Sequence, residues 1–458
     1  MDSAKIIFIL FSGILFFVIP LIVQNVRHYF LGLASSLYVF SSGWIFYHYN
    51  GLMLADLPIF GLLILSAMSD KRLRWSAPPV SFPLLGLIIW GIITSFSAIN
   101  PGWAFSETTK YMRMYVLIVV LVHHIQSMHD LRVVVNGMLI GLAIQVVIGI
   151  YQWRFGATGL WFLGERPWWR IRWRTAGTFF VPSFYANYLS MLLPVVFRLF
   201  LYYHPPNRKW SYFYGGVLVF GCVALFTTYG RGPWIGFAVS ITLLLLAGLF
   251  FGHFRARIRW TFSVILVFAL AFVIRYGPKV MDQFGADRDA SYDVRFPQFR
   301  IAQRMINDNI FLGVGLGNYE LVSYDYMTFE ERADNMAGVY RILVHNSYLL
   351  ILSESGLFGG FFLVAWFVTI FVAGIQVLLS RLRHPYFINI TLGILAGMTA
   401  IIIVFTFSPD IHAYQILYQL SIFSAILVAE KRLIKNALSR KRPLLQNQKR
   451  TIQKRSIQ

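Results

Sequence analysis

Residues 345–380 read HNSYLLILSESGLFGGFFLVAWFVTIFVAGIQVLLS, and this stretch decides the class of fold. It contains no lysine or arginine, and Glu354 is its one carboxylate. A helix crosses the hydrocarbon core of a bilayer with about 20 mostly apolar residues, so this stretch is long for one span. We therefore expect a membrane helix that is tilted or kinked near Gly356.

The rest of the chain is also strongly apolar. Of 458 residues, 57% are hydrophobic and 13% are charged, which excludes an ordinary soluble domain. Twelve further apolar runs lie near 6–23, 29–48, 51–69, 81–98, 111–126, 132–153, 183–204, 211–229, 232–251, 259–276, 386–407 and 411–430. The first run has no cleavage site behind it and is expected to be a retained span. Because the first three runs are weakly separated, we predict an all-α polytopic membrane protein of about 12 transmembrane helices, with 13 as the alternative.

The net charge of +21 is concentrated at particular connectors. Basic residues gather at 70–74, 207–209, 254–259, 381–384 and the tail 431–458. Positive-inside bias places these segments in the cytoplasm, where the tail contacts anionic membrane lipids, and we expect no nucleic acid as a partner. The sequence then divides into N-terminal spans (1–276), a large periplasmic loop with short helices (277–344), C-terminal spans (345–430) and the basic tail.

The outer connector 154–182 departs from this charge pattern. Arginines at 154, 166, 170, 172 and 174 alternate with tryptophans at 161, 168, 169 and 173. One interpretation is an interfacial belt with snorkelling side chains. The other is a vestibule that collects anionic substrates, and the two are compatible.

Arg231 and His345 are candidate site residues at the mouths of spans. Arg231 lies in Thr228-Tyr-Gly-Arg-Gly-Pro-Trp234, where Gly230 and Gly232 are expected to form a tight turn and Pro233 the first helical turn. It is either an orientation residue or a phosphate ligand held at a fixed depth. His345 is either an interfacial residue or a proton acceptor, since histidine titrates near neutral pH.

A polar segment between the spans supplies further candidates. We expect an amphipathic helix over 295–309, with Asp293 as N-cap, Pro297 near its start, and an apolar stripe of Phe299, Ala302, Ile306 and Ile310. Arg295 would hold an anion together with the helix N-terminus. Arg300 and Arg304 are expected to face solvent or headgroups.

The glycine-rich sequence Gly313-Val-Gly-Leu-Gly-Asn318 is expected to be a tight loop beside the substrate path. It has neither the strand nor the helix pattern of a nucleotide fold. Glu354 and the small residues Gly356–Gly360 are expected to provide a buried polar contact and helix packing. We find no metal-ligand constellation and a single cysteine, Cys222, so stabilisation of a phosphate would come from arginines.

These motifs, in this order, resemble the O-antigen ligase and polymerase superfamily. They are Arg-Thr-Ala-Gly-Thr-Phe (174–179), Gly-Arg-Gly-Pro-Trp (230–234), Arg295, Gly-Val-Gly-Leu-Gly-Asn-Tyr (313–319), His-Asn-Ser-Tyr (345–348) and Glu-Ser-Gly-Leu-Phe-Gly (354–359). The resemblance spans about residues 80–430. Two departures are Gly-Arg-Gly for Ser-Arg-Gly, and Val-Pro-Ser for Asn-Pro-Asn after Gly-Thr-Phe.

The resemblance implies a GT-C type, metal-independent glycosyltransferase of the bacterial inner membrane with no cofactor. Its donor would be an undecaprenyl-diphosphate-linked glycan, used at the periplasmic face, and its acceptor lipid A–core or another glycan. Arg231, Arg295 and His345 match the family's essential positions. Arg172, Arg174, Arg300 and Asn346 are candidate substrate-binding residues. The sequence leaves three functions open: an O-antigen ligase, a polymerase of the same superfamily, or a transporter of anionic lipid-linked sugars.

Overall fold

The computed structural model describes residues 13–40, 54–68, 77–156, 174–179, 181–203, 207–250, 288–334, 343–381 and 384–455. The described residues form helices and no strands. Six described helices are long and apolar enough to cross a membrane: α7 (Met128–Phe155), α9 (Pro182–Tyr202), α10 (Arg208–Thr227), α11 (Arg231–Phe250), α16 (Ser347–Leu378) and α17 (Pro385–Val404). The chain is therefore a helical membrane protein, as predicted. The total of about 12 spans stays a prediction, because the run at 259–276 lies outside the described residues.

The remaining helices are shorter or more polar. They are η1 (Ile14–Val18), α2 (Ile19–Ile22), α3 (Val26–Ser36), η2 (Leu37–Phe40), α4 (Asp56–Ala67), η3 (Pro79–Ser81), α5 (Phe82–Ser95), α6 (Pro101–His124), α13 (Arg288–Asp308), α14 (Tyr319–Val322), α15 (Phe329–Asp334), η6 (Asp410–His412) and α18 (Tyr414–Arg455). The apolar run at 111–126 is only the second half of α6. Its polar first half carries Glu107 and Lys110 and continues the same helix.

Local capping sets several of these boundaries. Asn100 accepts a hydrogen bond from the backbone N–H of Trp103 at the start of α6 (3.0 Å). Ser127 and Asp130 form a reciprocal capping box at the start of α7. Asn346 caps α16 by accepting from the N–H groups of Tyr348 and Leu349 (2.9 and 3.0 Å). Each cap satisfies N–H groups that have no partner within the helix.

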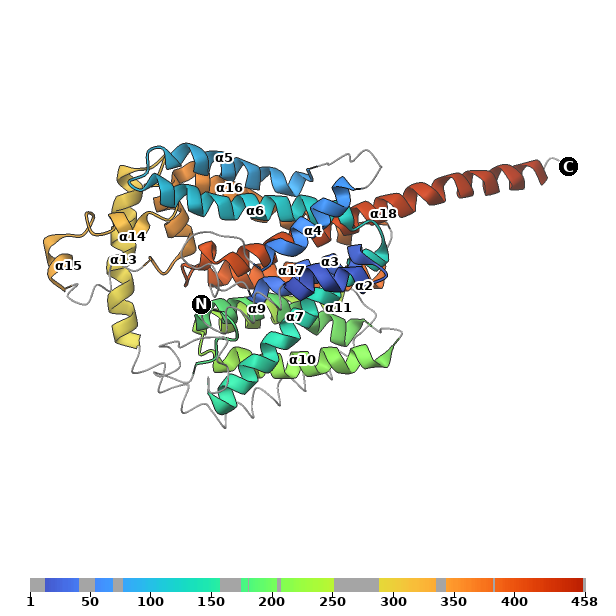
Figure 1. Cartoon of the computed structure of the whole chain (residues 1–458), viewed down its shortest axis with the longest axis horizontal. Coiled ribbons are helices and arrows are strands. Elements are labelled where there is room, and N and C mark those ends of the chain that lie inside the picture. The colour runs from blue at the N-terminus through green and yellow to red at the C-terminus, as the bar shows by residue number, and fades with distance from the viewer. Residues whose placement is uncertain are drawn as a thin grey trace.

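Two groups of helices make up the bundle. In one, α17 packs along α9 and α11, with α10 against α9; in the other, α5 packs on α6 and α16 (Figure 1). A Cβ on Gly397 of α17 would lie 2.1 Å from the carbonyl oxygen of Met191 in α9, so only glycine permits this approach. α18 contacts both groups before its C-terminal part extends beyond the bundle.

The two ends of the bundle differ in chemistry. At one end, α13 lies across the helices, next to the starts of α6 and α16 (Figure 1). At the other end lie the connectors around 207–209 and 381 and the basic part of α18. There Lys431 Nζ donates to Gln376 Oε1 (2.6 Å), and Arg432 donates to the carbonyl oxygen of Ile125. Of the predicted features that the structure describes, α13 and the start of α16 thus lie at one end, and the basic segments 207–209, 381 and 431–435 lie at the other.

Candidate functional site

A kink in α16 forms the base of the site. Gly356 has φ 64° and ψ −167° inside the helix, which confirms the kink expected there. This backbone conformation is essentially restricted to glycine. A Cβ at this position would also lie 2.1 Å from the carbonyl oxygen of Phe311.

The glycine-rich loop binds the backbone groups that this kink releases. The N–H groups of Val314 and Gly315 donate to the carbonyl oxygens of Ser353 and Glu354 (3.0 and 2.8 Å). In return, the N–H of Leu357 donates to the carbonyl oxygen of Ile310 (2.8 Å). Gly313, Gly315 and Gly317 all have positive φ. The loop is a tight turn, as predicted, and its role is to dock the segment before it onto α16.

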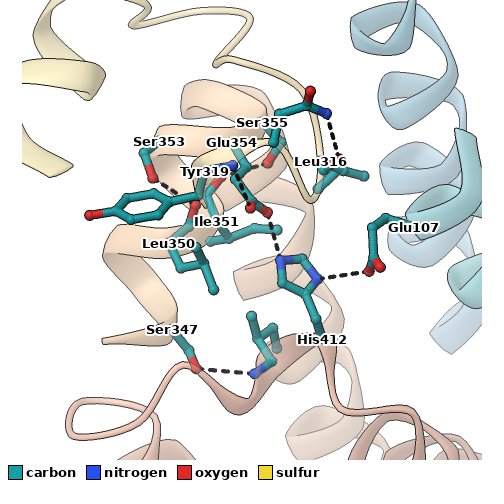
Figure 2. A network of polar contacts seen from close by, with 12 residues as sticks. Glu107, Leu316, Tyr319, Ser347, Leu350, Ile351, Ser353, Glu354, Ser355 and His412 are labelled. Carbon is teal, nitrogen blue, oxygen red and sulfur yellow. Dashed lines mark hydrogen bonds and ion pairs between the residues drawn. The ribbon is translucent and has the colours of Figure 1, made fainter. Parts of the chain in front are cut away.

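A buried polar network lies beneath the loop. Glu354 is fully buried, and its Oε2 lies 2.6 Å from Nε2 of His412 in η6. The other imidazole nitrogen, Nδ1, lies 3.6 Å from Glu107 Oε2 in α6. Figure 2 shows His412 between the two carboxylates. Lys110 Nζ donates to the Glu107 carboxylate (2.6 Å), so the network joins α6, α16 and η6 and alternates in charge.

The two carboxylates control the protonation of His412. Burial by itself lowers the pKa of His412, but the charge and hydrogen bond of Glu354 and the charge of Glu107 outweigh it. The net effect is a pKa of His412 above its usual range, so the two carboxylates favour the charged form of the imidazole.

His345 meets α13 just before α16 begins. Its Nδ1 lies 2.9 Å from Oε1 of Gln298, which is fully buried on α13. Burial lowers the pKa of His345, and the positive charge of Arg295 lowers it further. The structure thus brings two predicted site residues, Arg295 and His345, close together, and keeps the imidazole neutral near pH 7.

The position of Arg295 differs from the sequence prediction. α13 begins at Arg288, so Asp293 is not its N-cap, Pro297 lies inside the helix, and Arg295 is not at the helix N-terminus. An anion site formed by Arg295 with that N-terminus is therefore wrong. Gln298 follows Arg295 by three residues and so lies near it on one face of the helix.

The predicted apolar stripe of α13 is confirmed at Ala302, which is fully buried, and at Phe299, which packs against the core, but it is wrong at Ile310. The buried side chains are Gln298, Ile301, Ala302 and Met305, whereas Ile310 is exposed. Arg300 is exposed, two residues from Gln298 and so on the opposite face. Arg304 forms an ion pair with Glu331 of α15 instead of facing solvent or headgroups.

Arg231 is the first residue of α11, and Pro233 lies in its first turn as predicted. The tight turn before it comes from Tyr229, with φ 55°, and not from the two glycines. Gly230 and Gly232 pack closely instead: Cβ atoms there would lie 3.2 Å from Ala186 Cβ and 3.3 Å from Phe407 Cβ. Phe407 follows α17, at the same end of the bundle as His345.

Arg174 is joined to the Arg231 turn. Its Nε donates to the carbonyl oxygen of Thr228 (2.8 Å), and the N–H of Thr175 donates to that of Thr227 (3.1 Å). The segment 174–179 is also held by two buried glutamines of α7. Gln152 Oε1 accepts from the N–H of Gly177 (2.8 Å), and Gln145 Oε1 accepts from that of Thr178 (2.9 Å).

The other two predicted binding residues differ in what the structure shows of them. Asn346 uses its side-chain oxygen to cap α16, so it has a structural role whatever else it contacts. Arg172 lies outside the described residues, as do Arg166, Arg170 and the tryptophans at 161, 168, 169 and 173. Among the described residues, no group of three or more His, Cys, Asp or Glu side chains is placed to hold a metal ion.

Sequence reasoning missed Gln298, His412 and Glu107. Their signal was weak, because each lies in a different segment and only the fold brings them to the site. His412 was the most detectable of the three, because it is a titratable residue at the start of the apolar run 411–430, at the predicted outer end.

Residues 216–364 match the family model described as O-antigen ligase. The match confirms the resemblance to the O-antigen ligase and polymerase superfamily. It covers α11, α13, the glycine-rich loop and the first half of α16, and so includes Arg231, Arg295 and His345. No curated protein matches the chain. The family indicates a membrane glycosyltransferase of the O-antigen ligase or polymerase type, acting on lipid-linked glycans.

Proposed function

We propose that this protein is an O-antigen ligase of the bacterial inner membrane, with its site at the periplasmic face and its C-terminus in the cytoplasm. It would move a glycan from undecaprenyl diphosphate to a hydroxyl of lipid A–core or another glycan. The observation that carries the proposal is the neutral His345 beside Arg295, within the segment that matches the family. A neutral base next to a fixed cation suits transfer from a diphosphate donor.

The proposed reaction is one displacement at the anomeric carbon. His345 takes the proton of the acceptor hydroxyl while its oxygen attacks that carbon. The bond from the carbon to the diphosphate oxygen breaks, and its electron pair leaves with undecaprenyl diphosphate. Arg231 and Arg295 offset the negative charge that develops on the leaving group. With no covalent sugar–enzyme intermediate, the anomeric configuration inverts, and no metal ion is needed.

Glycan accumulation in a deletion strain tests the choice of acceptor. A ligase mutant accumulates long glycan on the carrier lipid, whereas a polymerase mutant accumulates single repeat units. Long carrier-linked glycan that disappears on complementation supports the ligase. Carrier lipid with single repeat units would support the polymerase instead of the ligase. Unchanged glycans would reject both functions.

A further inference from the structure

Gln298 is a buried polar side chain whose place in the fold is closely determined. It lies on the face of α13 that packs against α16, between Arg295 and the apolar residues Ile301 and Ala302. Its backbone carbonyl accepts a hydrogen bond from the Tyr319 hydroxyl (3.4 Å). Tyr319 is in turn held through its N–H by Glu354 Oε1 (3.3 Å), so the buried network fixes the position of α13.

The contact between Gln298 and His345 selects one form of the imidazole. Oε1 of an amide has no proton, so Nδ1 of His345 must donate in the 2.9 Å hydrogen bond. A neutral imidazole with its proton on Nδ1 has its lone pair on Nε2. Nε2 is then the nitrogen that can accept a proton.

We propose that Gln298 is a positioning residue that holds His345 in its Nδ1–H form, so that Nε2 takes the proton of the acceptor hydroxyl. This inference rests on the proposed function of His345 as the base. Gln298 does not touch the reacting atoms; it acts through the orientation and protonation of the imidazole.

The neutrality of glutamine matters at this position. A carboxylate would also accept from Nδ1, but its negative charge would favour the imidazolium and would attract Arg295. Glutamine fixes the proton on Nδ1 without either effect. Within the described part of the chain, Arg295 on the same helix is the charged group that acts on His345, and the Tyr319 hydroxyl of α14 contacts the backbone of Gln298.

Three variants test the proposal in purified enzyme in nanodiscs. Gln298→Glu keeps the acceptor and adds a charge, whereas Gln298→Met keeps the approximate size and removes the acceptor. Gln303→Glu makes the same charge change on an exposed face of α13 and is the matched control. One measurement is glycan transfer against pH. The other is carbethoxylation of His345 by diethyl pyrocarbonate against pH, followed by peptide mass spectrometry, with His384 as the internal reference.

We expect Gln298→Glu to raise the midpoint of His345 modification, and the acid limb of transfer, by about one pH unit. Gln298→Met should lower kcat roughly ten- to a hundred-fold, as loss of an imidazole's hydrogen-bonded partner does at metal sites, with a smaller effect on KM. Gln303→Glu and the His384 midpoint should match wild type.

Two results would reject different parts of the argument. If neither Gln298 variant changes the His345 midpoint or kcat, the positioning role is wrong. If the midpoint rises in Gln298→Glu but the acid limb of transfer stays in place, Gln298 governs His345 while the general-base function of His345 is wrong.

Discussion

At the residue scale, the central feature is a histidine kept neutral by its surroundings. Burial and the charge of Arg295 both lower the pKa of His345. The same arginine is proposed to hold the diphosphate, so one cation serves two purposes. It stabilises charge on the leaving group and keeps the base free of its proton.

Substitutions of Arg295 separate these two effects. Arg295→Lys keeps the charge but loses the guanidinium fork, so transfer should fall by about 2–4 kcal/mol in activation free energy while the acid limb stays in place. Arg295→Gln should lower the rate at least as far and also move the acid limb to higher pH, because the pKa of His345 rises. Arg231→Lys should lower the rate of transfer without moving the acid limb of the pH profile. Near-normal transfer by both lysine variants at matched expression would refute the diphosphate clamp.

His345→Ala tests the base directly. Loss of a general base costs about two to four orders of magnitude in rate, and donor binding should survive. In the wild type, activity should fall only at pH values below about 6.5, the ordinary histidine pKa, since that of His345 is lowered. The residual rate of the variant should be flat there. Transfer assays across pH, with and without a chelator, measure both effects. An unchanged rate and pH profile in His345→Ala would show that His345 has only a structural role. A requirement for a metal ion would refute the arginine-only mechanism.

His412 should make the stability of the fold depend on pH, because its pKa is raised, whereas that of His345 is lowered. Its pKa is raised by Glu354 and Glu107 despite burial, so its contribution is complete below about pH 6.5 and is lost as pH rises through the folded-state value. His412→Gln breaks a buried ion pair and should cost about 3–5 kcal/mol. Thermal unfolding in nanodiscs should show the largest Tm difference near pH 6 and a smaller one near pH 9. A difference independent of pH would contradict the charged His412.

The sequence drew attention to Arg231, Arg295 and His345 as candidates, but not to the side chains that contact them. Arginine and histidine at the mouths of apolar runs are recognisable because charge there is costly and needs a reason. Gln298 gave no such signal, since a glutamine in an amphipathic helix is ordinarily expected to face water. It is buried because α13 packs on α16, a tertiary contact that its own sequence pattern does not encode.

At the element scale, the kink of α16 and the glycine-rich loop depend on each other. The carbonyl groups that the kink releases are bound by the loop, and the loop carries the chain from α13 to α14. The kink was predictable because Gly356 interrupts a stretch too long for one straight span. The full buried face of α13 was not, because several stripes fit its mixed sequence and packing on α16 chose among them.

Gly356→Ala should therefore disrupt the site, although it changes none of the candidate catalytic side chains. A side chain at φ 64° and ψ −167° is strained by about 1–3 kcal/mol, and the Cβ would collide with the carbonyl of Phe311. We expect a lower Tm and a loss of transfer. Gly216→Ala in α10 is the control, because a Cβ there meets nothing within 4 Å. Equal Tm values for the two variants would show that the kink is not required.

At the scale of the whole molecule, the arrangement of the bundle supports one orientation. α13 lies at one end (Figure 1), and the starts of α16 and α11 approach each other around Phe405 and Phe407. The basic segments 207–209 and 431–435 lie at the other end, where Lys431 and Arg432 bind Gln376 and Ile125. A bilayer with an anionic cytoplasmic surface favours the basic end inside. The site would then face the periplasm, where a flipped lipid-linked glycan is accessible.

Cysteine labelling tests this orientation cleanly, because Cys222 is the only cysteine. In a Cys222→Ala background, single cysteines replace three exposed residues: Gln303 on α13, Lys209 at the start of α10 and Lys435 on α18. An impermeant maleimide, applied to cells with a permeabilised outer membrane, should label position 303 alone. Positions 209 and 435 should react only after lysis, which also shows that their thiols are accessible. Labelling of position 209 or 435 in intact cells, with protection of position 303, would show the opposite orientation. The proposed site would then face the cytoplasm.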